Sequence, residues 1–496
     1  MSLFKTNKST KTPRTPFDLS HERKTTFNIG ELAPVLVQEV VPGDQMRIQT
    51  QVHTKTAPLI APMMHRVDQY IHYFYVPNRL LWEYWDDFLT GELETTIPVL
   101  SSSSDIPVGG LHDHLGLPTG VTLTEIGNAS QLPIRAYYKI WNDYYRDQNF
   151  QDEIPVNDLE FSKRSSTAPL LKRNYERDYF TSALPWTQKG DPVGVPTTPN
   201  YIDTGSLAVN ASSAALITGD LRADSGAIND GTNSVIIKNL VDGAEESILI
   251  NDLRKANALQ RWLEKNARGG TRMVEYLKNH FGLQPQDARL NRAEYLGGGK
   301  STLQISEILN TSDTTNAPQG AMAGHGLGIG QTNSAKKFVP EYGYIIGIMS
   351  ILPKPAYMQG VPKHFIRQDN MDFYNPAFAH LGEQEILNKE LFITTDLGAP
   401  EGINEDTWGY QSRYAELKYS ANTVHGDFKD TLDFWHMTRK FASLPTLSEE
   451  FMLVDPADHE RVFAIEDDGE STKFWVQLYH DVKAIRPMPY YGEPKL

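Results

Sequence analysis

Two glycine-rich stretches contain the residue types that bind phosphate groups. Residues 297–301 read Gly-Gly-Gly-Lys-Ser, the end of a phosphate-binding P-loop, but that motif needs a glycine at the position of Glu294, whose charge would repel phosphate. Alternating glycines over residues 324–330 resemble a dinucleotide fingerprint, yet Ile329 stands where that motif needs glycine. We therefore expect a glycine turn in the first stretch and a flexible loop in the second, with no nucleotide cofactor.

Histidine and carboxylate clusters could bind metal ions, but each lacks a complete ligand pattern. Residues 112–114 read His-Asp-His, with no third ligand at a recognisable spacing, so a solvated loop is the better interpretation. An acidic run does not match the calcium-loop pattern, and a solvated surface or a subunit contact is favoured over calcium binding. The run consists of Asp147, Asp152, Glu153, Asp158 and Glu160. We expect no metal site.

The sequence shows no recognisable catalytic motif. It contains no cysteine, which excludes disulfides, thiolate metal sites and cysteine nucleophiles. Neither a Gly-x-Ser-x-Gly elbow nor a His-Glu-x-x-His pair is present, and nothing distinguishes one carboxylate pair among the 62 acidic residues. We expect a protein that is not an enzyme.

The first 16 residues form a basic segment that could contact nucleic acid. Lys5, Lys8, Lys11 and Arg14 lie among Ser, Thr and Pro, and no acidic residue accompanies them. Such a segment is a flexible arm, either solvated or in contact with nucleic acid. It has no apolar stretch, so we expect no secretory signal.

Composition limits the partners and the architecture. The chain has 496 residues and a net charge of −15, so any contact with nucleic acid must be local, because phosphate binding depends on Lys and Arg. With 23 Tyr, 20 Phe, 36 Gly and 30 Pro, the composition favours a β-rich architecture with many turns and long loops. Length alone would suggest about three domains.

Hydrophobic patterning predicts strands near both ends of the chain. Alternation over residues 46–54 is typical of a half-buried strand, and residues 70–76 predict a strand that is buried on both faces. Further strands are expected at 344–352, 412–419 and 432–440, and a hairpin is expected from 462–466 and 473–479.

Helices and long polar segments are expected between these strands. The predicted helices cover residues 80–89, 133–148, 251–269 and 271–282. In the third helix Leu253 and Leu259 share one apolar side, and in the fourth Phe281 is expected to point inward. Residues 95–133, 187–250 and 310–335 are polar or glycine-rich; the second is too long for an ordinary loop.

Six segments together resemble the major capsid proteins of the Microviridae, small bacteriophages with single-stranded DNA, and most closely their gokushovirus branch. No single segment is diagnostic, but their order along the chain is specific. They are residues 27–44, 61–91, 173–190, 292–298, 341–360 and 373–385. Residues 187–250 do not align with the family.

The resemblance implies a mainly β fold, an eight-stranded antiparallel jelly roll with long insertions, in a T = 1 icosahedral shell. We then expect an N-terminal arm (1–26) and one jelly-roll domain (27–496), with insertions at 95–133, 134–186, 187–250, 251–282 and 310–335. The implied partners are other copies of the chain, a scaffolding protein, a small basic DNA-binding protein, a minor DNA-delivery protein, packaged single-stranded DNA and a host receptor. The location would be the virion, assembled in the host cytoplasm.

Charge and the resemblance together suggest how the genome is neutralised. We expect Lys5, Lys8, Lys11 and Arg14 to face inward, with a basic protein and cations supplying most of the positive charge. The polar insertion 187–250 is expected to project outward and contact the host, or else to be a packing loop. The alternative function is that of a non-viral carbohydrate-binding β-sandwich.

Overall fold

The computed structural model describes residues 13–91, 96–100, 102–127, 129–157, 166–191, 193, 222–224, 227–229, 250–269, 272–283, 286–311, 319–395, 400–465 and 471–491. The chain divides into two compact units. The first comprises residues 1–187 and 270–496, and the second comprises residues 188–269.

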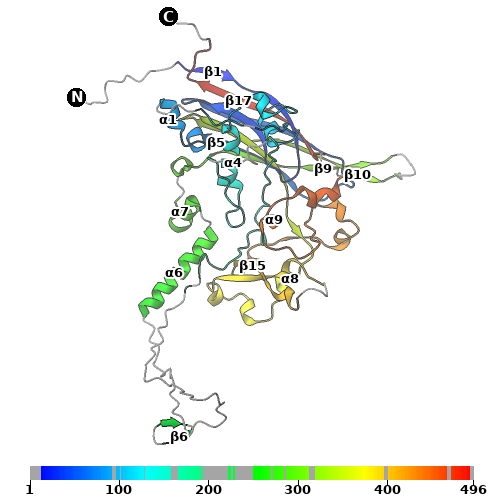
Figure 1. Ribbon diagram of the computed structural model, residues 1–496. Coiled ribbons are helices and arrows are strands. Elements are labelled where there is room, and N and C mark those ends of the chain that lie inside the picture. The colour runs from blue at the N-terminus through cyan, green and yellow to red at the C-terminus, as the bar shows by residue number, and fades with distance from the viewer. Residues whose placement is uncertain are drawn as a thin grey trace, which may run out of the picture. The chain divides into compact units, whose positions relative to one another are not determined.

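The first unit is built on two antiparallel sheets (Figure 1). In the larger sheet, β17 and β4 pair along most of their length. The short strands β1 and β2 pair with successive parts of β17, on the side away from β4. In the same way, β10 and β11 pair with successive parts of β4, on the side away from β17. Strand β9 pairs with β10. The strands are β1 (Thr15–Asp18), β2 (His21–Phe27), β4 (Gln45–Thr56), β9 (Gln304–Leu309), β10 (Met322–Gln331), β11 (Ala335–Phe338) and β17 (Phe474–Arg486).

The smaller sheet has the strand order β3-β12-β5-β8. Its strands are β3 (Ala33–Val40), β12 (Gly343–Pro353), β5 (Val67–Pro77) and β8 (Glu294–Thr302). The apolar and aromatic runs of β5 and β12 are buried on both faces, as predicted for residues 70–76. The fold is therefore mainly β with antiparallel sheets and helical insertions, which confirms the expected class.

The main core lies between the two sheets. Along β4 every second side chain is buried, including Met46, Ile48 and Val52, so the predicted alternation is confirmed. A buried polar contact also crosses the core, since the Tyr73 hydroxyl on β5 donates a hydrogen bond to the Thr50 hydroxyl on β4. Both sheets thus meet through apolar packing and a satisfied hydroxyl pair.

Helix α4 (Leu132–Ile140) covers the outer face of the smaller sheet, and a π-helical turn (Trp141–Tyr145) continues it. The Tyr144 ring lies 4.8 Å from the Phe74 ring on β5, centroid to centroid. The predicted helix over 133–148 therefore exists but ends earlier, because Arg146 adopts an extended conformation. The segment predicted as one helix over 80–89 consists of a 3-10 turn (Asn78–Leu80) and α1 (Trp85–Thr90).

A smaller hydrophobic cluster holds together residues from 179–183 and 357–452. It is centred on Phe180, Tyr357 and Trp408, and it packs beside a two-stranded sheet of β14 (Glu383–Leu387) and β15 (Thr407–Ser412). We call this part the 356–452 lobe. It also contains β13 (Ala356–Tyr357), β16 (Asn422–Thr423), α8 (Asn388–Leu391), α9 (Glu449–Met452) and several 3-10 turns.

Three of the predicted strands are wrong. Strand β15 ends at Ser412, and the positive φ of 58° at Tyr414 then leads the chain into a 3-10 turn, so residues 412–419 are not a strand. Residues 432–440 begin in a 3-10 turn, and the carbonyls of His436 and Thr438 accept hydrogen bonds from Arg461 instead of from a neighbouring strand. Residue 462 ends a 3-10 helix, so no strand precedes β17 to form the expected hairpin; residues 466–470 lie outside the described residues.

The two glycine-rich stretches are also strands. Residues 297–301 lie within β8 and not in a turn, and a Cβ atom on Gly298 would lie 2.1 Å from the Ile71 carbonyl oxygen. The expected loop at 310–335 contains all of β10, and a Cβ on Gly328 would lie 2.3 Å from Leu303 Cδ2. Both glycines permit a close approach that larger residues would prevent.

Two short helices, α2 (Leu111–Leu115) and α3 (Leu123–Ile126), interrupt the segment 95–133. Helix α7 (Met273–Phe281) ends at Gly282, as predicted, but Phe281 is exposed instead of pointing inward. In the second unit, β6 (Arg222–Asp224) pairs with β7 (Ala227–Asn229), and α6 (Ile250–Gly269) confirms the predicted helix. Leu253 and Leu259, expected to share a packing face of α6, are exposed.

Candidate functional site

The basic arm predicted from the sequence enters the fold at the larger sheet. Lys5, Lys8 and Lys11 lie outside the described residues. Arg14 directly precedes β1, and its guanidinium lies 5.8 Å from the centroid of the Phe338 ring on β11. Because β1 pairs with the last residues of β17, this end of the larger sheet is where the chain begins.

The histidines of the 112–114 segment are buried, so the expected solvated loop is wrong for them. His112 is fully buried, and burial lowers its pKa to about 4. His114 contacts the carbonyl oxygens of Gly110 and Thr26 at 3.0 and 3.1 Å. Across the part of the chain that the structure describes, no group of three or more His, Asp or Glu residues could hold a metal ion.

The lysine of the glycine-rich segment takes part in ion pairs inside the fold. The Lys300 ammonium on β8 lies 2.9 Å from the Asp68 carboxylate and 3.3 Å from that of Glu176. Lys354 also pairs with Glu176. These contacts join β5, β8 and the segment after residue 166, so Lys300 stabilises the fold.

The acidic run is dispersed. Asp147 is buried, where its carboxylate accepts a hydrogen bond from the Asn149 amide at 2.8 Å. Glu153 reaches Arg146 at 3.8 Å, whereas Asp158 and Glu160 lie outside the described residues. Asp147 and Glu153 therefore take part in local structure, and Asp152 is exposed.

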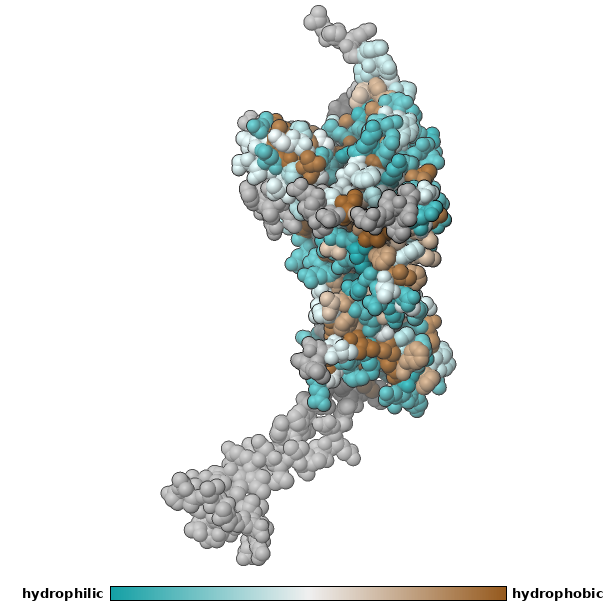
Figure 2. Space-filling view, turned by 90° about the vertical axis from the view of Figure 1, so that its right-hand side faces the viewer, coloured by the Kyte–Doolittle hydropathy of each residue, from teal (hydrophilic) through white to brown (hydrophobic). Residues whose placement is uncertain are grey.

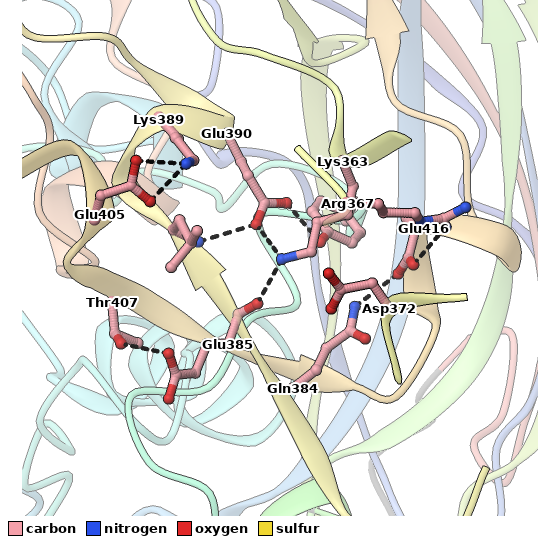
Figure 3. A network of polar contacts seen from close by, with 12 residues as sticks. Lys363, Arg367, Asp372, Gln384, Glu385, Lys389, Glu390, Glu405, Thr407 and Glu416 are labelled. Atoms are coloured by element: carbon pink, nitrogen blue, oxygen red, sulfur yellow. Dashed lines mark hydrogen bonds and ion pairs between the residues drawn. The ribbon is translucent and has the colours of Figure 1, made fainter. Parts of the chain in front are cut away.

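A network of polar side chains fills one side of the 356–452 lobe (Figure 3). Lys363 points between two acidic residues, donating to the Glu390 carboxylate at 2.6 Å and to the Glu385 carbonyl oxygen at 3.2 Å. The Tyr179 hydroxyl donates to Glu390 at 3.0 Å, and burial, followed by the Glu390 charge, raises the pKa of Tyr179. The Glu390 side chain is only 2% exposed, so these partners stabilise its charge.

A second group in the same network surrounds Glu416. Arg367 donates to its carboxylate at 2.8 Å and Gln384 donates at 2.7 Å. A cavity of about 610 Å³ borders both groups, and its wall includes aromatic side chains such as Phe180 and Tyr357. Each of these carboxylates has a cationic partner, Lys363 for Glu390 and Arg367 for Glu416, so the network stabilises the lobe.

Sequence reasoning did not find this network. Lys363, Glu390, Glu416 and Tyr179 come from segments far apart in the chain, so no local spacing indicates that they meet. The family-like segments 173–190, 341–360 and 373–385 overlap this region, but they do not indicate the network.

Large apolar side chains are exposed on the 356–452 lobe. Phe365 is 74% exposed, and several others are exposed by more than half of their area: Phe373, Tyr374, Leu381, Leu417 and Tyr419. Figure 2 shows hydrophobic side chains interspersed with hydrophilic ones on the face toward the viewer. Exposed apolar surface rimmed by polar residues is typical of protein–protein contacts.

Comparisons with known proteins give a consistent result over the full length of the chain. The family described as capsid protein (F protein) matches residues 5–496. Capsid protein VP1 of Chlamydia phage 1 is 34% identical over 580 residues, covering 97% of this chain and 96% of that protein. The VP1 of Bdellovibrio phage phiMH2K is 34% identical, covering 98% and 96%, and the VP1 of Spiroplasma virus 4 is 29% identical, covering 100% and 97%.

Proposed function

The chain belongs to the capsid protein (F protein) family and is a major capsid protein, and on this premise we propose that identical copies assemble into a T = 1 icosahedral shell around single-stranded DNA. The family match over nearly the whole chain carries the proposal. It agrees with the Microviridae resemblance and does not favour the carbohydrate-binding alternative. The role proposed is structural, without catalysis.

The strand order supports an eight-stranded jelly roll as the shell-forming domain. Counting β1 with β2 and β11 with β10, and leaving out the outermost β9, each sheet has four positions. Their orders are β2-β17-β4-β10 and β3-β12-β5-β8. Successive strands alternate between the two sheets except for β5 and β8, which are neighbours in the smaller sheet, and this is the order of a jelly roll. The two sheets also share one core.

The exposed apolar surface of the 356–452 lobe supports self-assembly. Side chains such as Phe365 and Tyr419 gain most when a neighbouring copy covers them, and a closed shell satisfies every such contact. A scaffolding protein would guide assembly if these contacts alone are too weak to nucleate the shell. Assembly is proposed in the host cytoplasm. Among the described residues, no helix combines the length and apolar character needed to span a bilayer.

The basic arm is proposed to face the genome. A chain with a net charge of −15 cannot neutralise packaged DNA by itself, so Lys5, Lys8, Lys11 and Arg14 would act with a small basic protein and cations. Trypsin treatment tests the arm: cleavage is expected only after particles are opened. Cleavage in intact particles at the same rate would place the arm outside.

The second unit is proposed as a surface projection that contacts the host receptor. It is a compact unit of residues 188–269 and contains all but the first residue of the polar insertion 187–250. A minor DNA-delivery protein is proposed as a further partner of the capsid.

Electron microscopy of the purified full-length chain, with and without a scaffolding protein, tests the assembly proposal. Closed shells of uniform size are expected. A chain that stays a monomer or dimer under both conditions and binds oligosaccharide would support the carbohydrate-binding alternative instead.

A further inference from the structure

The outer face of the larger sheet is basic, although the whole chain is acidic. Because side chains alternate along a strand, the exposed residues of β1, β2, β4, β11 and β17 share this face, as their register requires. Its Lys and Arg residues outnumber its Asp and Glu residues. They are Lys24, Arg47, Lys55, Lys336 and Lys483 against Asp18, Glu22 and Asp481.

One end of this face is a basic groove beside an exposed tryptophan. Trp475 on β17 is 43% exposed and pairs with Lys55 of β4, while Lys24 lies on the neighbouring β2. A cavity of about 530 Å³ is lined by these three residues together with Arg23 and His53. Neither Lys24 nor Lys55 forms an ion pair with any residue that the structure describes.

One carboxylate borders the groove. Asp113 contributes to its wall, and its carboxylate accepts a hydrogen bond from the Gly109 amide at 2.8 Å. This contact gives Asp113, in the first turn of α2, a hydrogen-bond partner next to its own helix, and the side chains of Lys24 and Lys55 are exposed.

The same face continues toward the N-terminal arm. Beyond Trp475, Tyr479 is 41% exposed, and Lys483 follows beside Arg47, with Asp18 paired to Lys483. Trp475 and Lys483 lie on one strand, so the face extends about 26 Å between them at about 3.3 Å per residue. It ends where Arg14 contacts Phe338, at the start of the basic arm.

In the described part of the chain the helices pack chiefly on the smaller sheet, and α2 also borders the groove at one end of this face. Helix α4 lies against β5 (Figure 1) and also packs on β12, and α2 packs on β3; these three strands belong to the smaller sheet. On the outer face of the larger sheet, Ile329 of β10 is 69% exposed and Trp475 and Tyr479 are partly exposed.

We propose that the outer face of the larger sheet binds single-stranded DNA, with Trp475 stacking on a base and Lys24 and Lys55 binding the flanking phosphates. Exposed aromatic side chains among basic ones are the features that bind single strands without sequence preference, because every base has a stacking face. The inference rests on the proposed function for the identity of the ligand. The contrast between this basic face and the acidic chain as a whole favours a polyanion as the ligand over another acidic subunit.

Fluorescence anisotropy with a labelled oligodeoxythymidylate and the full-length chain tests this site. Replacing Lys24→Gln and Lys55→Gln together is expected to weaken binding and to reduce the slope of log affinity against log salt by about 1.4, at about 0.7 per phosphate contact. Trp475→Ala is expected to weaken binding about tenfold with little change in that slope. The matched control is Lys278→Gln with Lys429→Gln, two exposed lysines away from this sheet.

The outcomes separate this proposal from the capsid function. Equal losses in the control pair, or unchanged DNA affinity in both face variants, would overturn the proposal. Face variants that bind DNA normally but no longer assemble would make this face a subunit contact and also reject it. Electron microscopy of wild-type particles tests the capsid function separately, and unchanged thermal transitions verify that each variant is folded.

Discussion

The carboxylate of Asp68 on β5 lies 2.9 Å from the ammonium of Lys300 on β8, in an ion pair whose acidic member is only 1% exposed. Asp68 also accepts a hydrogen bond from the Thr302 hydroxyl at 2.6 Å. Burial alone would raise the pKa of Asp68, but hydrogen bonds from Thr302, Lys300 and Arg66 lower it overall. The ion pair therefore stabilises the pairing of β8, an edge strand of the smaller sheet, with β5.

Asp68→Asn is expected to lower the free energy of unfolding by about 1–3 kcal/mol, because it removes a charge that several donors share. Since the folded pKa is lowered, the wild-type contribution is complete above the unfolded pKa of about 3.9 and is lost as pH falls through the folded pKa. Urea unfolding at pH 7 measures the loss. The control is Asp481→Asn, because the partly exposed ion pair of Asp481 with Lys483 is expected to contribute little to stability. Equal losses of unfolding free energy in both variants would contradict the role of Asp68.

Stability is expected to fall as the pH drops below neutrality, because buried histidines must be protonated on unfolding. His480 is fully buried between the sheets, 2.8 Å from the Thr50 hydroxyl, and burial, with the nearby His21 charge, lowers its pKa to about 4. The unfolded pKa is about 6.5, so stability is complete above that pH and falls by up to about 1.4 kcal/mol per unit toward pH 4. His480→Gln should reduce this slope by about one proton, measured by urea unfolding from pH 7 to 4. The exposed His425→Gln is the control, and an unaltered slope in the His480 variant would contradict the assignment.

Two glycines on facing strands predict different responses to the same substitution. In Gly298→Ala the new Cβ meets a backbone carbonyl oxygen at 2.1 Å, which can move only if β5 and β8 separate. In Gly328→Ala the first contact is a terminal methyl group of Leu303 at 2.3 Å, and a side chain can rotate away. We expect Gly298→Ala to cost at least about 2 kcal/mol and Gly328→Ala to cost less. Soluble yield and urea midpoints compare them, and the reverse order would show that the smaller sheet is more adaptable than its register suggests.

Local patterns predicted the elements whose environment follows from their own residues. Alternation identified β4, and aromatic density identified β5, because each feature reports burial directly. From the sequence alone the glycines of β10 predict a loop. A larger side chain at Gly328 would collide with Leu303 and Gln69, which come from other segments, so the local sequence does not indicate why glycine is needed there. The strand predicted over 432–440 fails for a similar reason, because Arg461 supplies the donors that a neighbouring strand would have supplied. The polar network around Glu390 unites distant segments, so only the tertiary structure reveals it.

Replacing the second unit, residues 188–269, by a Gly/Ser linker is expected to separate attachment from assembly. The unit has its own contacts and the strands of the two large antiparallel sheets all belong to the first unit, so particles should still form. If the unit contacts the host, adsorption of these particles to host cells should fall at least about tenfold while their number by electron microscopy stays similar. A control with the same linker inserted between residues 193 and 194, keeping the unit intact, accounts for the linker itself. Normal adsorption by the deleted particles would reject the receptor role, and failure to assemble only in the deletion would make the unit a subunit contact instead.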